Sequence, residues 1–315
     1  MFTKIKEIVD RGRTFLVTTH IDPDGDAVGS ALAVYYALKR LGKEATVYLR
    51  DKVPYRYDFL PRPSEDLVHE IPEKPFDGIF VMDCGNFFRV GDGYEKLKGK
   101  GPIINIDHHE TNEAFGQINI LDERASSTAE ILFLILKALA VPFNYEMAIN
   151  IYTAILTDTG SFRYENTHPR SFTICEEMTR HGVQPSFVAG MVYENHPKQR
   201  FLLLCLVLET LKTYHDDKLA IVVVTEEMFE RTNTNREYTD GFVELLKEMK
   251  GLEVAALARQ IGPESYKISM RSKGRVDVAS VALTFGGGGH KNAAGCTIEG
   301  KAEEVREKLV GAITF

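Results

Sequence analysis

Apolar positions follow two different spacings along the first half of the chain. Short, nearly continuous apolar runs are typical of buried strands, and apolar residues three or four positions apart are typical of helices. Strands are expected at 14–19, 44–49, 79–82 and 103–106, and helices at 26–41, 127–140, 144–156 and 169–181. This alternation predicts an α/β fold in which helices cover both faces of a parallel sheet.

The second half of the chain predicts a smaller α/β domain with a Gly-Gly-Gly-Gly-His loop at 286–290. A stretch with two prolines and a glycine interrupts the pattern between the halves, as is typical of a connection. We therefore expect domains at 1–185 and 197–315, joined by a linker at 186–196. The elements expected in the second domain are helices at 199–211, 240–249, 276–285 and 302–313, and strands at 219–225, 253–260 and 266–271.

The charge balance limits the kind of anionic ligand that the protein binds. The 315 residues include 45 acidic and 38 basic side chains, which gives a net charge of −7 with histidine neutral. Proteins that bind long nucleic acids through the phosphates usually carry a basic surface. An anionic ligand is therefore expected to be small, or to meet a local positive field that metal ions supply in part.

The cysteines and the apolar runs indicate the cellular compartment in which the protein is expected. Cys84, Cys175, Cys205 and Cys296 lie far apart and form no Cys-x-x-Cys pair. This spacing argues against a structural zinc site or a disulfide framework and fits a reducing compartment. The first ten residues lack the apolar core of a signal peptide, and the longest apolar runs are too short to cross a bilayer. We therefore expect a cytoplasmic protein without a membrane segment.

Ionisable side chains gather where several of the expected strands end. Residues 20–26 (His-Ile-Asp-Pro-Asp-Gly-Asp) follow the first strand, Asp83 ends the third, and residues 107–109 (Asp-His-His) end the fourth. Parallel strands place their carboxyl ends side by side, about 5 Å apart. Carboxylates crowded in this way need protons or a cation to balance their charge. The sequence therefore predicts a metal site at this edge of the sheet.

Parts of this pattern also have a structural explanation. Asp26 could be the N-cap of the helix that follows it, and an isolated Asp-Gly-Asp is usually a turn. Asp158 lies in Thr-Asp-Thr-Gly, which could equally be a turn that ends a helix. A single histidine on an apolar face is more often structural. Two adjacent histidines preceded by an aspartate at a strand end are not easily explained in that way.

Together, these residues resemble the four signature motifs of the DHH phosphoesterase superfamily. That superfamily includes RecJ-type exonucleases, family II inorganic pyrophosphatases and NrnA-type oligoribonucleases. Residues 271–272 (Arg-Ser) and 286–295 resemble the DHH-associated C-terminal domain of the NrnA group, so the resemblance covers nearly the whole chain. The positions that match the signature motifs in order and spacing are His20, Asp24, Asp26, Asp83, Asp107, His108, His109 and Asp158.

The resemblance implies a site for two divalent metal ions. Oxygen and imidazole ligands without thiolates suit Mn²⁺ or Mg²⁺, and the histidines favour Mn²⁺. Two such ions activate water and clamp a phosphoryl oxygen. The implied ligands are His20 and Asp24 for one ion, Asp26 and His108 for the other, Asp83 as the bridge, and Asp158 to complete the pair.

Three residues are expected to act in catalysis: Asp83, Asp107 and His109. Asp107 would orient a neighbouring imidazole. His109 would face the substrate, where it stabilises the phosphate or protonates the leaving oxygen. The alternative for His109 is a hydrogen bond that supports the metal ligands.

Substrate binding is expected of cationic and glycine positions as well as His109. Glycines allow the backbone to approach an anion closely, although the glycine run could also be a flexible loop. Arg89 is a phosphate-binding candidate, with a surface ion pair as the alternative. The positions expected to contact substrate are His109, Arg89, Arg271, Ser272, Gly288, Gly289 and His290.

The resemblance implies hydrolysis of short RNA or DNA oligonucleotides and linear dinucleotides to nucleoside 5′-monophosphates, of 3′-phosphoadenosine 5′-phosphate (pAp) to AMP, or of both. Three other functions stay open: a RecJ-like single-strand exonuclease, a pyrophosphatase or polyphosphatase, and a binding module without turnover. The acidic balance disfavours the exonuclease. Phe201–Leu208 is apolar enough for a homodimer interface, although a buried helix explains it as well.

Overall fold

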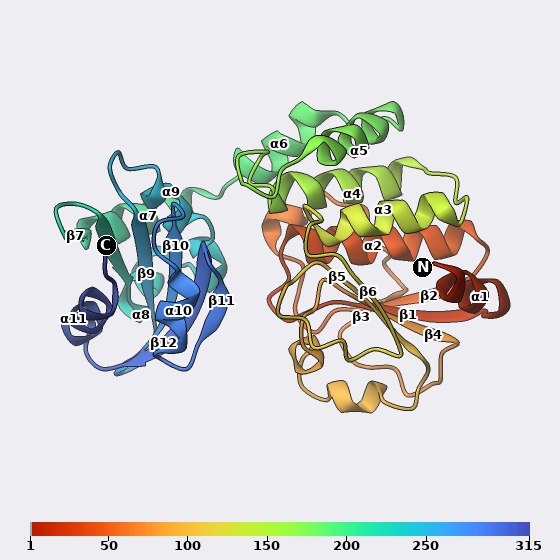
Figure 1. The fold of residues 1–315 in the computed structure, drawn as a ribbon, viewed down its shortest axis with the longest axis horizontal. Coiled ribbons are helices and arrows are strands. Elements are labelled where there is room, and N and C mark those ends of the chain that lie inside the picture. Colours follow the sequence, from red (N-terminus) through yellow and green to blue (C-terminus); the bar gives the residue numbers. More distant parts are fainter. Residues whose placement is uncertain (1) are drawn as a thin grey trace. The chain divides into compact units, whose positions relative to one another are not determined.

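A six-stranded sheet forms the centre of the first of two units (Figure 1). The computed structural model describes residues 2–315; its first unit ends at Asn195, and the second comprises His196–Phe315. All neighbouring strands of the first sheet are parallel, in the order β3-β2-β1-β4-β5-β6. The predicted parallel α/β sheet is thereby confirmed. Its strands are β1 (Thr14–Thr18), β2 (Glu44–Tyr48), β3 (Leu67–Val68), β4 (Gly78–Met82), β5 (Ile103–Asp107) and β6 (Ile118–Leu121).

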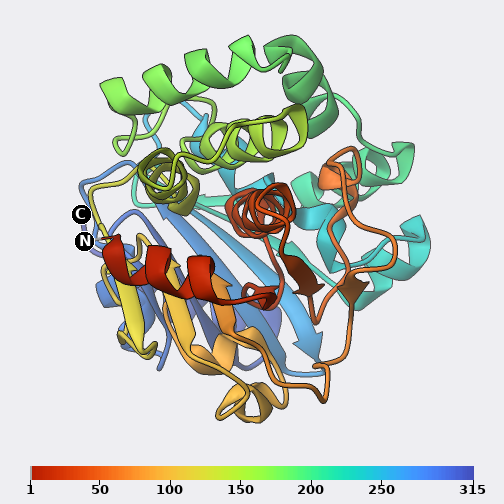
Figure 2. The same ribbon diagram turned by 90° about the vertical axis from the view of Figure 1, so that its right-hand side faces the viewer.

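Helices cover the two faces of this sheet in different ways. On one face, α2 and α3 lie over the strands, and α4 and α5 form a further layer outside them (Figure 1). Helix α1 packs on the same face through Ile5 and Val9 (Figure 2). The other face is covered by the 3₁₀-helices η2 and η3 and by loops. The helices are α1 (Thr3–Arg11), α2 (Gly25–Arg40), α3 (Thr128–Ala138), α4 (Tyr145–Asp158), α5 (Pro169–Arg180), α6 (Pro185–Tyr193), η1 (Tyr55–Tyr57), η2 (Phe87–Val90) and η3 (Tyr94–Leu97).

The second unit is a smaller α/β domain around a mixed sheet. Its strand order is β11-β12-β10-β9-β8-β7, in which β8 and β9 are parallel and the other pairs antiparallel. Helices α10 and α11 pack on one face, and α7, α8 and α9 on the other. The elements are β7 (Lys212–Tyr214), β8 (Leu219–Val224), β9 (Val254–Gly262), β10 (Ser265–Ser272), β11 (Gly288–His290), β12 (Ala293–Glu299), α7 (Lys198–Glu209), α8 (Glu226–Thr232), η4 (Arg236–Thr239), α9 (Phe242–Lys247), α10 (Val278–Leu283) and α11 (Ala302–Ala312).

The linker prediction at 186–196 is wrong in its extent. Most of that segment is helix α6, whose Val188 and Val192 are fully buried in the core of the first unit. Pro185 stands at the start of this helix, where its missing N–H costs no hydrogen bond. The two units divide at its far end, between Asn195 and His196.

The glycine run at 286–290 is also more ordered than the expected loop. Gly288–His290 form strand β11, which pairs antiparallel with the start of β12. A Cβ at Gly289, whose φ is +143°, would lie 2.5 Å from the carbonyl oxygen of Ala293. Glycine is needed there because the two strands approach closely. The run therefore builds a hairpin.

Helix α7 is buried on one side only. Leu203 and Val207 belong to the core of the second unit, whereas Phe201 and Leu202 are about half exposed. The expectation of a buried helix thus holds for one face. Among residues 2–315, none of the helices combines the length and the apolar character needed to cross a membrane.

Candidate functional site

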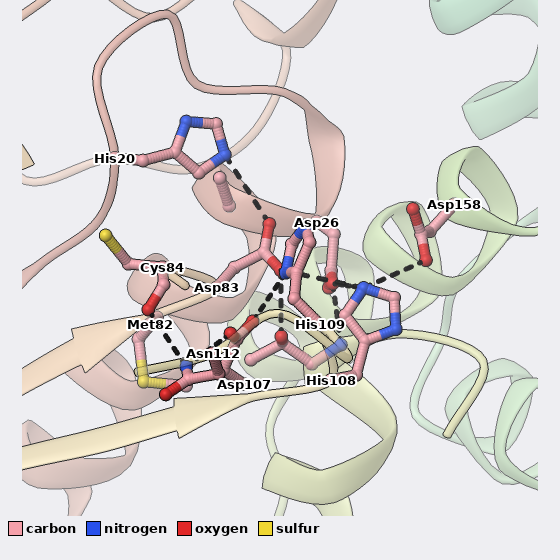
Figure 3. A network of polar contacts seen from close by, with 12 residues as sticks. His20, Asp26, Met82, Asp83, Cys84, Asp107, His108, His109, Asn112 and Asp158 are labelled. Carbon is pink, nitrogen blue, oxygen red and sulfur yellow. Dashed lines mark hydrogen bonds and ion pairs between the residues drawn. The ribbon is translucent and has the colours of Figure 1, made fainter. Parts of the chain in front are cut away.

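The predicted site residues of the first unit meet at one edge of its sheet. Strand order reverses between β1 and β4, because the chain adds β2 and β3 on one side and β5 and β6 on the other. In open α/β sheets, ligands bind at the carboxyl ends of the strands at such a switch point. The segments that follow β1, β4 and β5 supply His20, Asp83 and the histidine pair, and Figure 3 shows these side chains together with Asp26 of α2 and Asp158 at the end of α4.

One group of candidate ligands consists of His20, Asp24 and Asp83, each with one donor atom within 4.8 Å of the others. His20 Nε2 lies 3.6 Å from Asp83 Oδ2. The other ring nitrogen, Nδ1, lies 2.7 Å from the carbonyl oxygen of Ile21, which accepts its proton. That hydrogen bond sets the tautomer, so Nε2 carries the lone pair toward the group.

A second group consists of Asp26, His108 and Asp158, again with donor atoms within 4.8 Å of one another. His108 Nε2 lies 4.0 Å from Asp26 Oδ2 and 3.5 Å from Asp158 Oδ2. His108 Nδ1 donates to the carbonyl oxygen of Ala125 at 3.2 Å. Both histidines therefore point Nε2 inward, in the arrangement that metal-bound histidines adopt.

Asp83 lies between the two groups (Figure 3). Its Oδ2 faces His20, whereas its Oδ1 lies 3.7 Å from His108 Nε2. The residue follows directly on β4 and has a φ of +51°, an uncommon conformation for a residue with a side chain. The two oxygens of one buried carboxylate thus serve both groups, as a bridging ligand requires.

The chemistry of these donors fits divalent cations. Asp158 Oδ2 is buried and has no hydrogen-bond partner among residues 2–315. Burial raises the pKa of Asp158 to about 7 and, together with Asp83 and Asp158, raises that of Asp26 well above its usual value. Burial alone would lower the pKa of His108, but Asp158, Asp83 and Asp26 raise it to about 10. Without a cation, protons would have to balance the crowded carboxylates.

Asp107 contacts His109, one imidazole of the adjacent pair, and its orienting role stays a prediction. His109 Nδ1 donates to Asp107 Oδ1 at 2.7 Å, and Asp107 is fully buried. Burial would lower the pKa of His109, but the hydrogen bond to Asp107 and the charge of Asp83 raise it. The other oxygen, Asp107 Oδ2, accepts from Asn112 Nδ2 at 2.5 Å. Asn112 was not among the sequence candidates, because nothing in its polar loop distinguishes it from a surface residue.

The structure separates the roles of Asp24 and Asp26. Asp24 is the N-cap of α2, and its Oδ1 accepts from the N–H groups of Asp26 and Ala27. The alternative of Asp26 as the N-cap is therefore wrong. Asp26 lies inside the first turn and is 1% exposed. Asp158 is the last residue of α4, so the helix does end there, but its side chain points into the second group.

Arg89 lies beside the first group. Its Nη2 is 3.4 Å from His20 Nδ1, and its carbonyl oxygen accepts from the N–H of Ile21 at 2.7 Å. The backbone of Arg89 is thus fixed beside the cluster, and its half-buried guanidinium lies next to His20. This position is compatible with binding a phosphate group there.

The candidates of the second unit lie in neighbouring strands. Arg271 of β10 and His290 of β11 are both register partners of Ala293 in β12. Residues directly opposite in a sheet share a face, so Arg271 and His290 point the same way, two strands or about 10 Å apart. Arg271 Nε donates to Glu244 Oε1 of α9 at 2.8 Å. Gly288 and Gly289 precede His290 in the same strand.

Ser272 faces away from this row. Ser272 is 2% exposed. Its side chain lies on the same buried face of β10 as Met270, opposite the face that carries Arg271. Its hydroxyl accepts from the N–H of Gly274 at 3.0 Å, within the turn after the strand. Successive residues of a strand point to opposite faces, so the side chains of Arg271 and Ser272 lie on different faces of β10. That Ser272 contacts substrate stays a prediction.

Comparison with known proteins supports the same division of the chain. The model of the DHH family N-terminal domain matches residues 14–157, and that of the DHHA1 domain matches residues 216–314. A bifunctional oligoribonuclease and PAP phosphatase NrnA of Thermus thermophilus is 35% identical over 300 residues, which cover 94% of this chain and 88% of that protein. The protein of the same name in Bacillus subtilis is 24% identical over 309 residues, which cover 95% and 93%.

A solved structure shares the whole architecture. It is that of an exopolyphosphatase-related protein from Bacteroides fragilis, with a TM-score of 0.90 and 27% identity. The match covers 99% of this chain and 94% of that one. The chain therefore belongs to the DHH family of phosphoesterases, in the group of NrnA-type oligoribonucleases and PAP phosphatases.

Proposed function

We propose that the protein hydrolyses short oligonucleotides and linear dinucleotides to nucleoside 5′-monophosphates, and pAp to AMP, at a two-metal site. The observation that carries this proposal is the position of Asp83, whose two oxygens face two separate groups of ligands. Two relatives, in Thermus thermophilus and Bacillus subtilis, are named for both activities. Manganese is the preferred metal because imidazoles belong to the donor set, and magnesium is the alternative.

The candidate ligands are assigned to two ions according to the two groups that they form. His20 and Asp24 would hold one ion, Asp26, His108 and Asp158 the other, and Asp83 both. When bound, such a pair polarises phosphoryl oxygens and supplies a nucleophile at neutral pH. The protein's contribution is to fix these donors before substrate arrives.

His109 is the proposed proton donor to the leaving oxygen. His109 Nδ1 donates its proton to Asp107 Oδ1, 2.7 Å away, so Nε2 is the atom through which the ring would act. Asp107 raises the basicity of the ring and keeps it in one orientation. Arg89, beside His20, would bind a phosphate oxygen.

Arg271→Ala and His290→Ala are each expected to raise KM for a dinucleotide about tenfold or more and to leave kcat within a few fold. Each removes a cationic or hydrogen-bonding group from the proposed binding row, and a hydrogen bond to a charged group contributes about 1.5–3 kcal/mol. Steady-state kinetics would separate the two parameters. Lys212→Ala is the control, because it removes a cation from β7 at the opposite edge of the same sheet. Unchanged KM in the His290 variant would contradict this role.

A substrate panel in Mn²⁺ tests the proposed activity. It would compare a dinucleotide, a five-nucleotide RNA, long single-stranded DNA, pAp, pyrophosphate and polyphosphate. We expect turnover of the dinucleotide and pAp to exceed that of the long strand and pyrophosphate by at least about tenfold. The polyphosphate arm is included because the Bacteroides fragilis relative is named as exopolyphosphatase-related. Preference for the long strand, or for pyrophosphate, would replace the proposal with one of the alternative functions.

A cytoplasmic location and a homodimer complete the proposal. All four cysteines are free, as a reducing compartment requires. Helix α7 exposes Phe201 and Leu202, which would form the contact between two copies. Light scattering at several concentrations would measure the mass, and a monomer throughout would remove the dimer from the proposal.

A further inference from the structure

The first turn of helix α3 contacts two of the proposed metal-binding carboxylates. The N–H of Thr128 donates to Asp26 Oδ2 at 2.6 Å, and the N–H of Ala129 donates to Asp26 Oδ1 at 3.1 Å. The hydroxyl of Thr128 donates to Asp83 Oδ1 at 2.9 Å. Thr128 is fully buried, and the two aspartates are 1% and 2% exposed. One residue therefore contacts ligands that come from two different loops of the sheet.

The contact with Asp83 fixes the direction of its carboxylate. Oδ1, which accepts from Thr128, is the oxygen that faces His108, and Oδ2 is the one that faces His20. Rotation of the carboxylate would turn both oxygens away from their groups. The hydroxyl holds one oxygen, so it also determines where the other one points.

The helix end that carries Thr128 is itself held firmly. Ser127 caps α3, and the hydroxyl of Ser126 donates to Glu130 Oε2 at 2.7 Å. Arg170 of α5 donates to Glu130 Oε1 at 2.6 Å, although Glu130 is fully buried. Buried, charge-assisted hydrogen bonds of this kind restrict motion. These hydrogen bonds restrict the first turn of α3, from which the Thr128 side chain extends.

We propose that Thr128 is a positioning residue of the two-metal site, whose hydroxyl holds Asp83 in the orientation that lets it serve both ions. The inference rests on the proposed two-metal function and deepens it. Thr128 acts through Asp83 and is not itself a ligand. Any residue except proline at 128 keeps the backbone N–H that binds Asp26, so replacement by valine, alanine or serine tests the hydroxyl.

Thr128→Val removes this hydroxyl and keeps the β-branched shape. We expect the variant to bind Mn²⁺ about 10- to 100-fold more weakly at one or both sites, as is typical when a group that orients a ligand is lost. Titration calorimetry of the whole protein with Mn²⁺ alone would give the number of ions and each affinity. Thr128→Ser, which keeps the hydroxyl, should restore affinity to within about threefold of the wild type.

Thr153→Val is the matched control. Thr153 lies in α4, is fully buried, and its hydroxyl has no hydrogen-bond partner in the described part of the chain. The same substitution there should leave Mn²⁺ affinity unchanged. Thr128→Ala provides a second hydroxyl-free variant if Thr128→Val does not fold. Wild-type affinity in a folded hydroxyl-free variant would overturn the role of Thr128, whereas failure of the wild type to bind Mn²⁺ would overturn the two-metal function itself.

Discussion

Asp83→Asn is expected to lower kcat for a dinucleotide by about 10³-fold or more. Asparagine has the same shape and still accepts from the Thr128 hydroxyl, but it has lost the charge that lets one side chain serve both groups. Charge stabilisation by a metal pair contributes several kcal/mol, and about 4 kcal/mol corresponds to 10³-fold in rate. Single-turnover kinetics with saturating Mn²⁺ and enzyme in excess would measure the chemical step directly.

The loss in Asp83→Asn should not come from unfolding. Burial would raise the pKa of Asp83, but the hydrogen bond with His20 and the charges of His109 and His108 lower it, so asparagine removes a charge that stabilises the metal-free protein. Thermal melts without metal are therefore expected to show a variant somewhat less stable than the wild type, and kcat is compared at a temperature at which both proteins are folded. Asp66→Asn is the control, because Asp66 binds Tyr35 and Lys39 on the same unit, away from the cluster. A kcat within tenfold of the wild type in Asp83→Asn would exclude Asp83 as the bridging ligand.

The sequence could predict the edge of the sheet at which the site lies. Strands β1, β4 and β5 are short apolar runs, and each is followed at once by ionisable residues. Parallel strands end at the same edge whatever their order, so the gathering of Asp83 and His108 did not depend on knowing the order. The strand order itself, with β1 between β2 and β4, could not be predicted from the pattern of apolar residues.

Residues that act through long-range contacts could not be predicted. Thr128 lies 45 positions from Asp83 and 102 positions from Asp26, and in the sequence it is only the residue after a helix cap. Asn112 likewise could be recognised as part of the site only from its hydrogen bond to Asp107. Strand β11 and the start of β12 were missed because their alanine and glycine residues have low strand propensity. Pairing of β12 with β10, and of β11 with β12, decides their conformation.

Protons and metal ions compete for the same site, which makes the stability of the first unit depend on pH. The pKa of Asp158 is raised to about 7, so its favourable contribution is complete below the unfolded value near 3.8 and is lost as pH rises through 7. The pKa of His108 is raised to about 10, so its contribution falls between about 6.5 and 10. The metal-free protein should therefore be less stable at pH 8 than at pH 6, whereas bound cations replace these protons.

Removal of metal is expected to abolish hydrolysis of every substrate and to lower the stability of the first unit. An ion present at 1,000 times its dissociation constant stabilises the folded state by about 4 kcal/mol. For a unit of this size, that corresponds to a rise in Tm of roughly 10 °C. Exhaustive chelation, followed by calorimetric melts with and without added Mn²⁺, would measure the shift, and activity should return with the metal.

The size of this shift also distinguishes a bridged pair of ions from a single adventitious one. Because Asp83 faces both groups, its replacement by asparagine should reduce the Mn²⁺-dependent rise in Tm well below that of the wild type. The shift should also be larger at pH 8 than at pH 6, since fewer protons then compete for Asp158 and His108. Cleavage that survives complete chelation, or a rise in Tm that Asp83→Asn leaves intact, would be incompatible with ions held between these two groups of ligands.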